Sequence, residues 1–207
     1  MTLAVGIDVG VMKGCHAVGL DADAKVVVHE RIADPAVLGP LLQTWDADVV
    51  AIDSPPRWAP TGQRSRACER ALLRLGIHCF FTPDEARGGG HAFYQWMTVG
   101  FECFRVARAL GWEPLEVFPH ACAVTLLGAC PPAGTRKREW RTAALARAGV
   151  DVGPLRTIDD LDAALAAFAG LAWRRGTASL VGHPAEGEIV LPVANLAARY
   201  GRAAPDD

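Results

Sequence analysis

The chain has 207 residues, which is enough for one domain with a proper core and too few for two large lobes around a cleft. Hydrophobic residues make up 51% of it and charged residues 21%, a globular composition that excludes extended disorder. The net charge of −2 excludes nucleic-acid binding through an overall basic field, so any such binding requires a local patch.

The first part of the chain predicts three strands, over residues 3–9, 14–20 and 25–32. Residues 21–24, with the sequence Asp-Ala-Asp-Ala, form a hairpin turn signal between the second strand and the third. We therefore expect the sheet to open with antiparallel neighbours.

A helix, a strand and a second helix are predicted next. Asp34 followed by Pro35 is typical of a helix start, and leucines follow at helical spacing. Residues 48–53 form a short strand that is apolar on both faces, as in a sheet covered on both sides. The second helix spans about residues 63–75 and ends at Gly76, a residue type that often terminates helices.

The middle of the chain predicts a further strand over residues 77–81 and a mobile glycine-rich loop over 82–91. A long helix near 92–110 follows this loop. A short strand over 114–118 then ends at a proline.

Helices are also predicted over residues 136–148 and 159–174, and an extended segment over 187–192. A meander of strands followed by strands alternating with helices predicts an α/β domain. Its mixed sheet has three antiparallel strands and then parallel ones, flanked by helices. We expect a single domain over 1–207, with a loop and helix insertion near 82–112 and a polar C-terminal tail from about 202.

The cysteines and histidines do not predict a metal or redox site. The six cysteines include no Cys-x-x-Cys pair, and the six histidines show no zinc-like spacing. The N-terminus lacks a signal-peptide pattern, and no apolar run approaches the length of a membrane span. We expect a cytoplasmic protein without membrane contact.

Two carboxylates close apolar strands. Asp8 follows Leu-Ala-Val-Gly-Ile, and Asp53 follows Asp-Val-Val-Ala-Ile. Open α/β sheets bind their ligands at the carboxyl ends of strands, which favours a functional interpretation. The alternative is that each acid only opens the turn behind its strand.

The last predicted helix carries three further acids. Thr157 and Asp160 match a capping box, which explains Asp160 without a functional role. Asp162 lies one turn inside the helix and is not explained by capping. Because Asp159 and Asp162 are three residues apart, they face the same way and present two carboxylates together.

These acids predict a divalent-metal site. Two carboxylates about 4 Å apart repel by roughly 4 kcal/mol at an effective dielectric near 20, so a cation or a proton must be present. Oxygen ligands suit Mg²⁺ or Mn²⁺, which support phosphoryl chemistry. The predicted ligands are Asp8, Asp53, Asp159, Asp162 and Glu116, with Asp8, Asp53 and Asp162 as the catalytic set. The alternative for Glu116 is a solvated position on an edge strand.

Arginines on the second predicted helix suggest phosphate contacts. Arg66, Arg70 and Arg74 recur every four residues, and an anion would relieve their mutual repulsion. The alternative is local pairing with Glu69 or simple solvation. Other phosphate-contact candidates are Arg57 and the cluster Arg136, Lys137, Arg138 and Arg141.

Five segments, in order and across nearly the whole chain, resemble the domain-of-unknown-function 429 family, whose members are predicted RNase H-like nucleases. The segments are Gly6-Ile7-Asp8, Ala51-Ile52-Asp53-Ser54-Pro55, Glu116-Val117-Phe118-Pro119, Asp159-Asp160-Leu161-Asp162-Ala163-Ala164 and Gly187-Glu188-Ile189-Val190-Leu191-Pro192. The resemblance implies a ribonuclease H-like sheet in which Asp8, Asp53 and Asp162 meet at one edge. The spacing of Asp159 and Asp162 is also similar to that of Holliday-junction resolvases, which carry two acids on their final helix.

Three hypotheses follow. The first is a Mg²⁺- or Mn²⁺-dependent nuclease whose partner is a nucleic acid. The second is a nucleotide-binding domain related to one lobe of actin and sugar kinases, because Asp8-Val9-Gly10 has their Asp-x-Gly turn. The third is a non-catalytic binding module in which the acids are structural.

Overall fold

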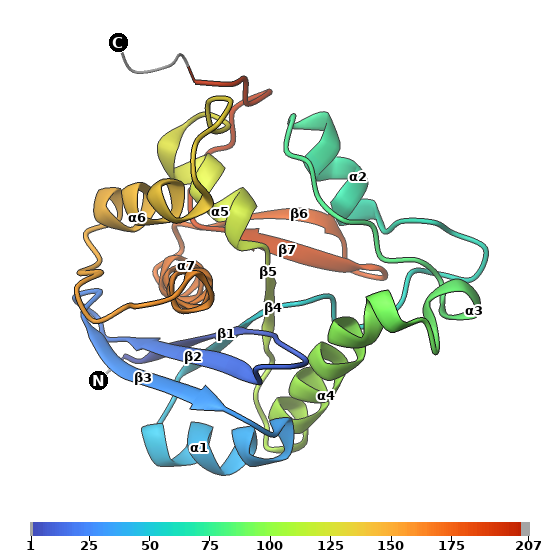
Figure 1. Ribbon diagram of the computed structural model, residues 1–207, viewed down its shortest axis with the longest axis horizontal. Helices are drawn as coiled ribbons and strands as arrows, with labels where there is room; N and C mark the ends of the chain where they lie inside the picture. The colour runs from blue at the N-terminus through green and yellow to red at the C-terminus, as the bar shows by residue number, and fades with distance from the viewer. Residues whose placement is uncertain (1, 204–207) are drawn as a thin grey trace.

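A seven-stranded mixed sheet forms the centre of the computed structural model, which describes residues 2–203 (Figure 1). The strands are β1 (Ala4–Asp8), β2 (Cys15–Leu20), β3 (Val26–Ile32), β4 (Val49–Asp53), β5 (Leu115–Val117), β6 (Ser179–His183) and β7 (Gly187–Leu191). Their order is β3-β2-β1-β4-β5-β7-β6. β1, β2 and β3 are antiparallel, β1, β4, β5 and β7 are parallel, and β6 adds an antiparallel edge. The predicted mixed sheet is confirmed.

Helices cover both faces of this sheet. They are α1 (Leu38–Trp45), α2 (Ala67–Arg74), α3 (Glu85–Gly88), α4 (Gln95–Ala109), α5 (Pro119–Leu127), α6 (Lys137–Arg147) and α7 (Ile158–Arg174), with 3-10 turns at Pro35–Val37 and Ala92–Tyr94. Figure 1 shows α7 end-on between the sheet and the pair α5 and α6, whereas α1 and α4 lie on the opposite face. None of the helices within residues 2–203 combines the length and the apolar character needed to cross a membrane.

The central helix α7 lies directly on β1. A Cβ atom at Gly6 would lie 2.0 Å from the carbonyl oxygen of Ala163 and 2.3 Å from the nitrogen of Ala167. No side chain larger than hydrogen fits there, and the small alanines of α7 permit the same close approach from the other side. The sequence of α7, rich in Ala and Leu, therefore produces a buried helix at a fixed position on the sheet.

Several elements differ from the sequence prediction: β6 was not predicted, and α3 lies within the segment 82–91 that was predicted as a loop. Residues 77–81 form a loop rather than a strand: Ile77 is buried and His78 exposed, but the segment follows α2 and pairs with no strand among residues 2–203. The apolar residue Ile77 followed by the polar His78 reflects one side chain packed inward from a loop, and does not indicate a strand. The helix α5 was not predicted, although Pro119 occupies its first turn, where proline is favoured. The end of the predicted C-terminal tail, residues 204–207, lies outside the described residues.

The predicted capping box at the start of α7 is confirmed. Thr157 Oγ1 accepts a hydrogen bond from the Asp160 nitrogen at 3.0 Å, and Asp160 Oδ2 accepts one from the Thr157 nitrogen at 2.7 Å. Asp160 Oδ1 also lies 2.7 Å from His16 Nδ1 and 3.1 Å from His29 Nε2. Asp160 thus connects α7 to β2 and β3.

Replacing Asp160 by alanine should lower the free energy of unfolding by about 1–2 kcal/mol, the usual cost of losing a helix cap. Burial raises the pKa of Asp160, but hydrogen bonds from His16, the Thr157 backbone and His29 outweigh it, so the net pKa is lowered. The stabilisation should therefore be present at neutral pH and decline in acid, as the pH falls through this lowered pKa. Urea unfolding at several pH values measures both effects.

Asp159→Ala is the matched control for this prediction, because its carboxylate is 37% exposed and one residue away. An equal loss of stability in both variants would contradict a specific role for Asp160.

Candidate active site

Asp8 and Asp53 lie side by side at the ends of two central strands. The parallel register of β1 and β4 pairs Asp8 with Asp53. Because side chains alternate along a strand, both acids point to the same face as Gly6, which is the face covered by α7. Each carboxyl group is close enough to shift the pKa of the other.

The start of α7 adds two further acids to this pair. Asp162 is 4% exposed, and the Asp159 carboxylate is 37% exposed. Burial and then Asp53, Asp162 and Asp159 raise the pKa of Asp8, while Lys137 lowers it. Burial and Asp162 likewise raise the pKa of Asp53, against the nearby cations on α6. The fold therefore gathers four predicted acids into one electrostatic cluster that favours a bound proton or cation.

Two cationic side chains of α6, Lys137 and Arg141, pair with Asp162. Arg141 donates a hydrogen bond from Nε to Asp162 Oδ1, and Lys137 Nζ lies 3.0 Å from Asp162 Oδ2. Arg141 is 3% exposed, and its Nη1 lies 3.3 Å from His120 Nδ1. Burial and Arg141 lower the pKa of His120 to about 4, so this imidazole is neutral at pH 7 and can accept from the guanidinium. His120 was not among the predicted site residues.

Part of the acidic cluster, Asp8 and Asp53, is suited to bind a divalent cation, whereas Asp162 is paired with other side chains. Asp8 and Asp53 offer neighbouring carboxylate oxygens with raised pKa, the donor chemistry that Mg²⁺ and Mn²⁺ prefer. Within residues 2–203, however, no three His, Cys, Asp or Glu side chains are already arranged as a metal site. Both oxygens of Asp162 instead face Arg141 and Lys137. The strand-end pair is in place, whereas Asp162 has cationic side chains as its present partners.

Glu116 does not join the acidic cluster. In the register of β4 and β5 it lies beside Ile52 rather than Asp53, so its side chain points to the opposite face of the sheet from Asp53. It is 6% exposed, and Arg66 donates to both of its oxygens, from Nη1 to Oε2 at 2.7 Å and from Nη2 to Oε1. The expectation that Glu116 contributes to the metal site, and its alternative as a solvated edge residue, are both corrected by this pairing.

Arg66 is not the surface phosphate contact that the sequence predicted. The helix α2 begins at Ala67 rather than near residue 63, and Arg66 precedes it with 2% exposure. Its Nε donates to Glu69 Oε1 at 3.1 Å, in addition to the contacts with Glu116. A guanidinium that is buried and paired in this way cannot reach the backbone of a nucleic acid.

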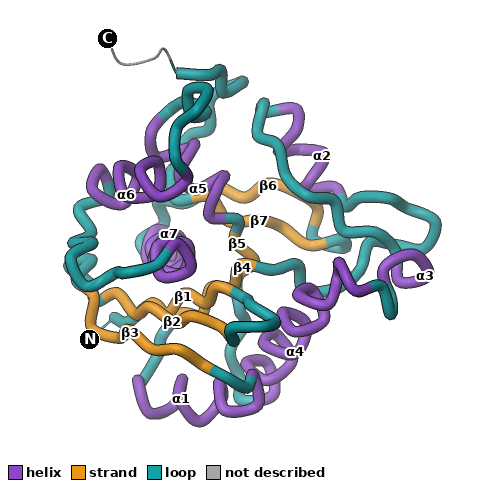
Figure 2. The backbone as a smooth tube through the Cα atoms, in the orientation of Figure 1, coloured by secondary structure: helices purple, strands orange, loops and turns teal. Residues whose placement is uncertain are grey.

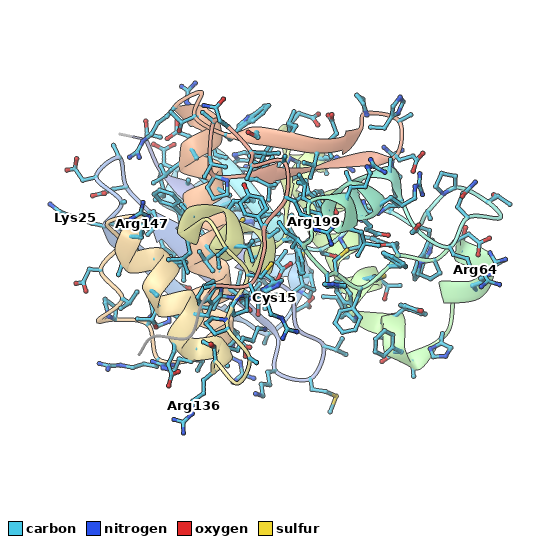
Figure 3. All side chains as sticks on the ribbon, turned by 90° about the horizontal axis from the view of Figure 1, so that it is seen from above. Cys15, Lys25, Arg64, Arg136, Arg147 and Arg199 are labelled. Atoms are coloured by element: carbon cyan, nitrogen blue, oxygen red, sulfur yellow. The ribbon has the colours of Figure 1, made fainter. Side chains whose placement is uncertain are left out.

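Of the other predicted phosphate contacts, Arg141 is buried, whereas the rest are at least partly exposed. Arg57 is exposed, and the Arg70 side chain is 41% exposed and lies 3.4 Å from Glu186. Lys137 is 56% exposed and lies at the acidic cluster. Figure 3 shows Arg136, at the start of α6, extending away from the body of the protein with 84% of its side chain exposed. Among the exposed candidates, Lys137 directly contacts a predicted catalytic acid, Asp162.

A cavity of about 340 Å³ adjoins Asp53. Its lining residues Asp53, Ser54 and Pro55 lie at and just after the carboxyl end of β4. Figure 2 shows the loops that connect β4 to α2 and α2 to α3. The apolar and aromatic walls of the cavity include Pro55, Phe80, Phe93, Trp96, Met97 and Phe118, and its polar groups include Lys137, Thr82, Arg66, Glu69 and Glu116. This cavity was not predicted from the sequence, although seven Phe, Tyr and Trp residues between positions 80 and 104 were a signal for it.

No protein-family model and no curated protein sequence matches the chain. Several solved structures are similar, and two of them are structures of RuvC. RuvC from Thermus thermophilus is 13% identical, with a TM-score of 0.50 over 87% of this chain and 99% of that chain. T. thermophilus RuvC in complex with Holliday junction substrate is 15% identical, with a TM-score of 0.51 over 85% and 97%. At this identity the likeness concerns the fold, which is ribonuclease H-like, as predicted.

Proposed function

We propose that this chain is a Mg²⁺- or Mn²⁺-dependent nuclease with a ribonuclease H-like fold, and that it belongs to the domain-of-unknown-function 429 family. The observation that carries the proposal is the pairing of Asp8 with Asp53 at adjacent strand ends, facing two more acids on α7. A purely structural role does not account for two adjacent, half-buried carboxylates whose pKa values are both raised, by burial and by neighbouring acids. Support also comes from RuvC, whose solved complex contains a Holliday junction substrate.

Each acid has a role in this proposal. Asp8 and Asp53 hold the metal, and Asp159 and Asp162 complete its surroundings from α7. A bound Mg²⁺ or Mn²⁺ supplies Lewis-acid stabilisation of the phosphate and an activated water. Without a cation, the raised pKa values of Asp8 and Asp53 favour their protonated forms at neutral pH, so the ionised form of this pair depends on the cation.

The cations of α6 position the acids and the substrate. Arg141 is buried and donates a hydrogen bond to Asp162, and the neutral His120 accepts from the Arg141 guanidinium and orients it. Lys137 is half exposed on a flexible side chain and lines the cavity beside Asp53. In our proposal Lys137 releases Asp162 and binds a phosphate of the substrate instead. This change brings the phosphate to the acids and frees a carboxylate oxygen of Asp162.

Cleavage assays on a panel of labelled substrates test this function. Wild-type protein should cut at least one of single-stranded RNA, single-stranded DNA and a four-way DNA junction when Mn²⁺ is present, and none in EDTA. Asp8→Asn should cut none of them, because it removes one of the paired carboxylates. Equal residual cleavage by the wild type and Asp8→Asn would reject the assignment.

A non-catalytic binding module is the second candidate, because Lys137 and Arg141 already satisfy both oxygens of Asp162. The two candidates differ in the response of thermal stability to Mn²⁺. A cation bound only by the folded state must raise the melting temperature, so an unchanged melting temperature in Mn²⁺ favours the module.

A further inference from the structure

We propose that the cavity beside Asp53 binds one unstacked nucleobase of the substrate strand, against Phe80 and Phe93, with its polar edge toward Glu69 and Glu116. The inference rests on the proposed function, since it names the substrate class as strands with an unpaired nucleotide at the site. A volume of about 340 Å³ lies within the usual range of small-molecule pockets and accommodates a base with part of its sugar.

The mouth of the cavity is aromatic and exposed. Phe80 is 70% exposed and Phe93 is 52% exposed, and their ring centroids are 5.8 Å apart with an interplanar angle of 69°. Phe80 lies in the loop after α2 and Phe93 in the 3-10 turn Ala92–Tyr94, and the angle between their rings lets a flat base stack on one ring and contact the other. Exposed aromatic side chains at the entrance of a cavity mark a binding surface, and bases stack on such rings.

The floor of the cavity is polar and carries more acceptors than donors. Glu69 and Glu116 share the single guanidinium of Arg66, and all three are at most 6% exposed. Each oxygen of Glu116 accepts one hydrogen bond from Arg66, although a carboxylate oxygen has two lone pairs. The spare acceptors suit the amino group of a base edge, as a carboxylate does when it accepts from the amino group of cytosine.

The position of the cavity connects the base to the acids. Asp53 and Lys137 are among its lining residues, and Lys137 also lies 3.0 Å from Asp162. A base in the cavity therefore places the phosphate of its own nucleotide near the paired carboxylates. Since a base inside an intact duplex cannot enter, loops, junctions and single strands should bind better than continuous duplex.

Binding without metal tests the pocket separately from catalysis. A fluorescent single-stranded oligodeoxycytidine in EDTA should bind wild-type protein more tightly than an abasic strand of equal length, an oligodeoxythymidine or free cytidine monophosphate. Combining Phe80→Ala with Phe93→Ala should weaken binding of the oligodeoxycytidine roughly five- to hundredfold, the usual range for lost base stacking, and leave the abasic strand unaffected. Both side chains are largely exposed, so the variant should fold.

Phe81→Ala is the matched control, because Phe81 is 39% exposed and adjacent in sequence but does not line the cavity. It should bind like the wild type. Equal binding of the abasic strand and the oligodeoxycytidine, or an unchanged affinity in the double variant, would overturn the base pocket. Equal affinity for free cytidine monophosphate would overturn recognition within a strand, and equal affinity for oligodeoxythymidine would overturn recognition through the amino group. Since no metal is present, a failed cleavage assay leaves these outcomes intact.

Discussion

Asp53→Asn is expected to lower metal-dependent cleavage at least about 100-fold, equivalent to about 2.7 kcal/mol of barrier, while raising the free energy of unfolding. The loss follows from removing one of two adjacent metal-binding carboxylates. The gain follows because an amide keeps the shape of the side chain but removes a buried acid whose ionisation is opposed by burial and by Asp162. Cleavage rates and urea unfolding in EDTA measure the two effects on one protein.

The pH dependence of stability should follow the raised pKa values of Asp8 and Asp53. A carboxyl with a raised pKa binds more protons in the folded state than in the unfolded state. Stability without metal should therefore fall as the pH rises from the ordinary value of 3.8 through neutrality. Asp53→Asn should flatten this slope, and Mn²⁺ should stabilise the wild type but not the variant.

Asp46→Asn is the matched control for Asp53→Asn. Asp46 is exposed, lies before β4 at the end remote from Asp53, and has a left-handed backbone that asparagine also adopts readily. Its cleavage rate and its pH slope should equal those of the wild type. A variant of Asp53 that keeps full activity, or that loses stability in EDTA, would contradict the proposed site.

Arg66→Met is expected to have the largest effect on stability, a loss of about 3–5 kcal/mol in the free energy of unfolding. Methionine fills similar space but leaves Glu69 and Glu116 as buried carboxylates without their shared cation. Burial already raises the pKa of Glu116 in spite of Arg66, so the carboxylate cannot remain ionised without further cost. Urea unfolding at pH 7 measures the loss.

Arg70→Met, one turn further along the chain on α2, is the matched control. Its guanidinium is 41% exposed and pairs with Glu186 at 3.4 Å, an interaction that contributes about 1 kcal/mol or less. Adding Glu69→Gln and Glu116→Gln to Arg66→Met should recover much of the lost stability, because neutral amides remove the uncompensated charge. A loss in Arg66→Met no greater than in Arg70→Met would contradict the role of the buried cluster.

The sequence predicted those parts of the site that depend on local pattern. Asp8 and Asp53 are recognisable because each closes a continuous apolar run, and the Thr157 and Asp160 cap depends on residues three positions apart. Their meeting at one edge was inferred from a family resemblance rather than from the pattern. The capping box and the mixed sheet are confirmed, while the catalytic roles stay predictions.

Glu116 and Arg66 were misjudged because their positions depend on distant parts of the chain. The face on which Glu116 lies depends on the register between β4 and β5, which no local pattern specifies. Arg66 looked like part of an exposed stripe because its partner, Glu116, is 50 residues away. The cavity was missed for the same reason, since its walls come from segments that are far apart in sequence.

The contact between α7 and β1 at Gly6 is backbone against backbone, with no layer of deformable side chains between them. The helix α7 therefore cannot rotate or slide on β1, because either movement would force main-chain atoms together. The distance between the backbone positions of the acids on α7 and of Asp8 on β1 is therefore fixed by main-chain packing. Movement that accommodates a substrate is therefore expected at α6, which contacts Asp162 of α7 through the long, flexible side chains of Lys137 and Arg141.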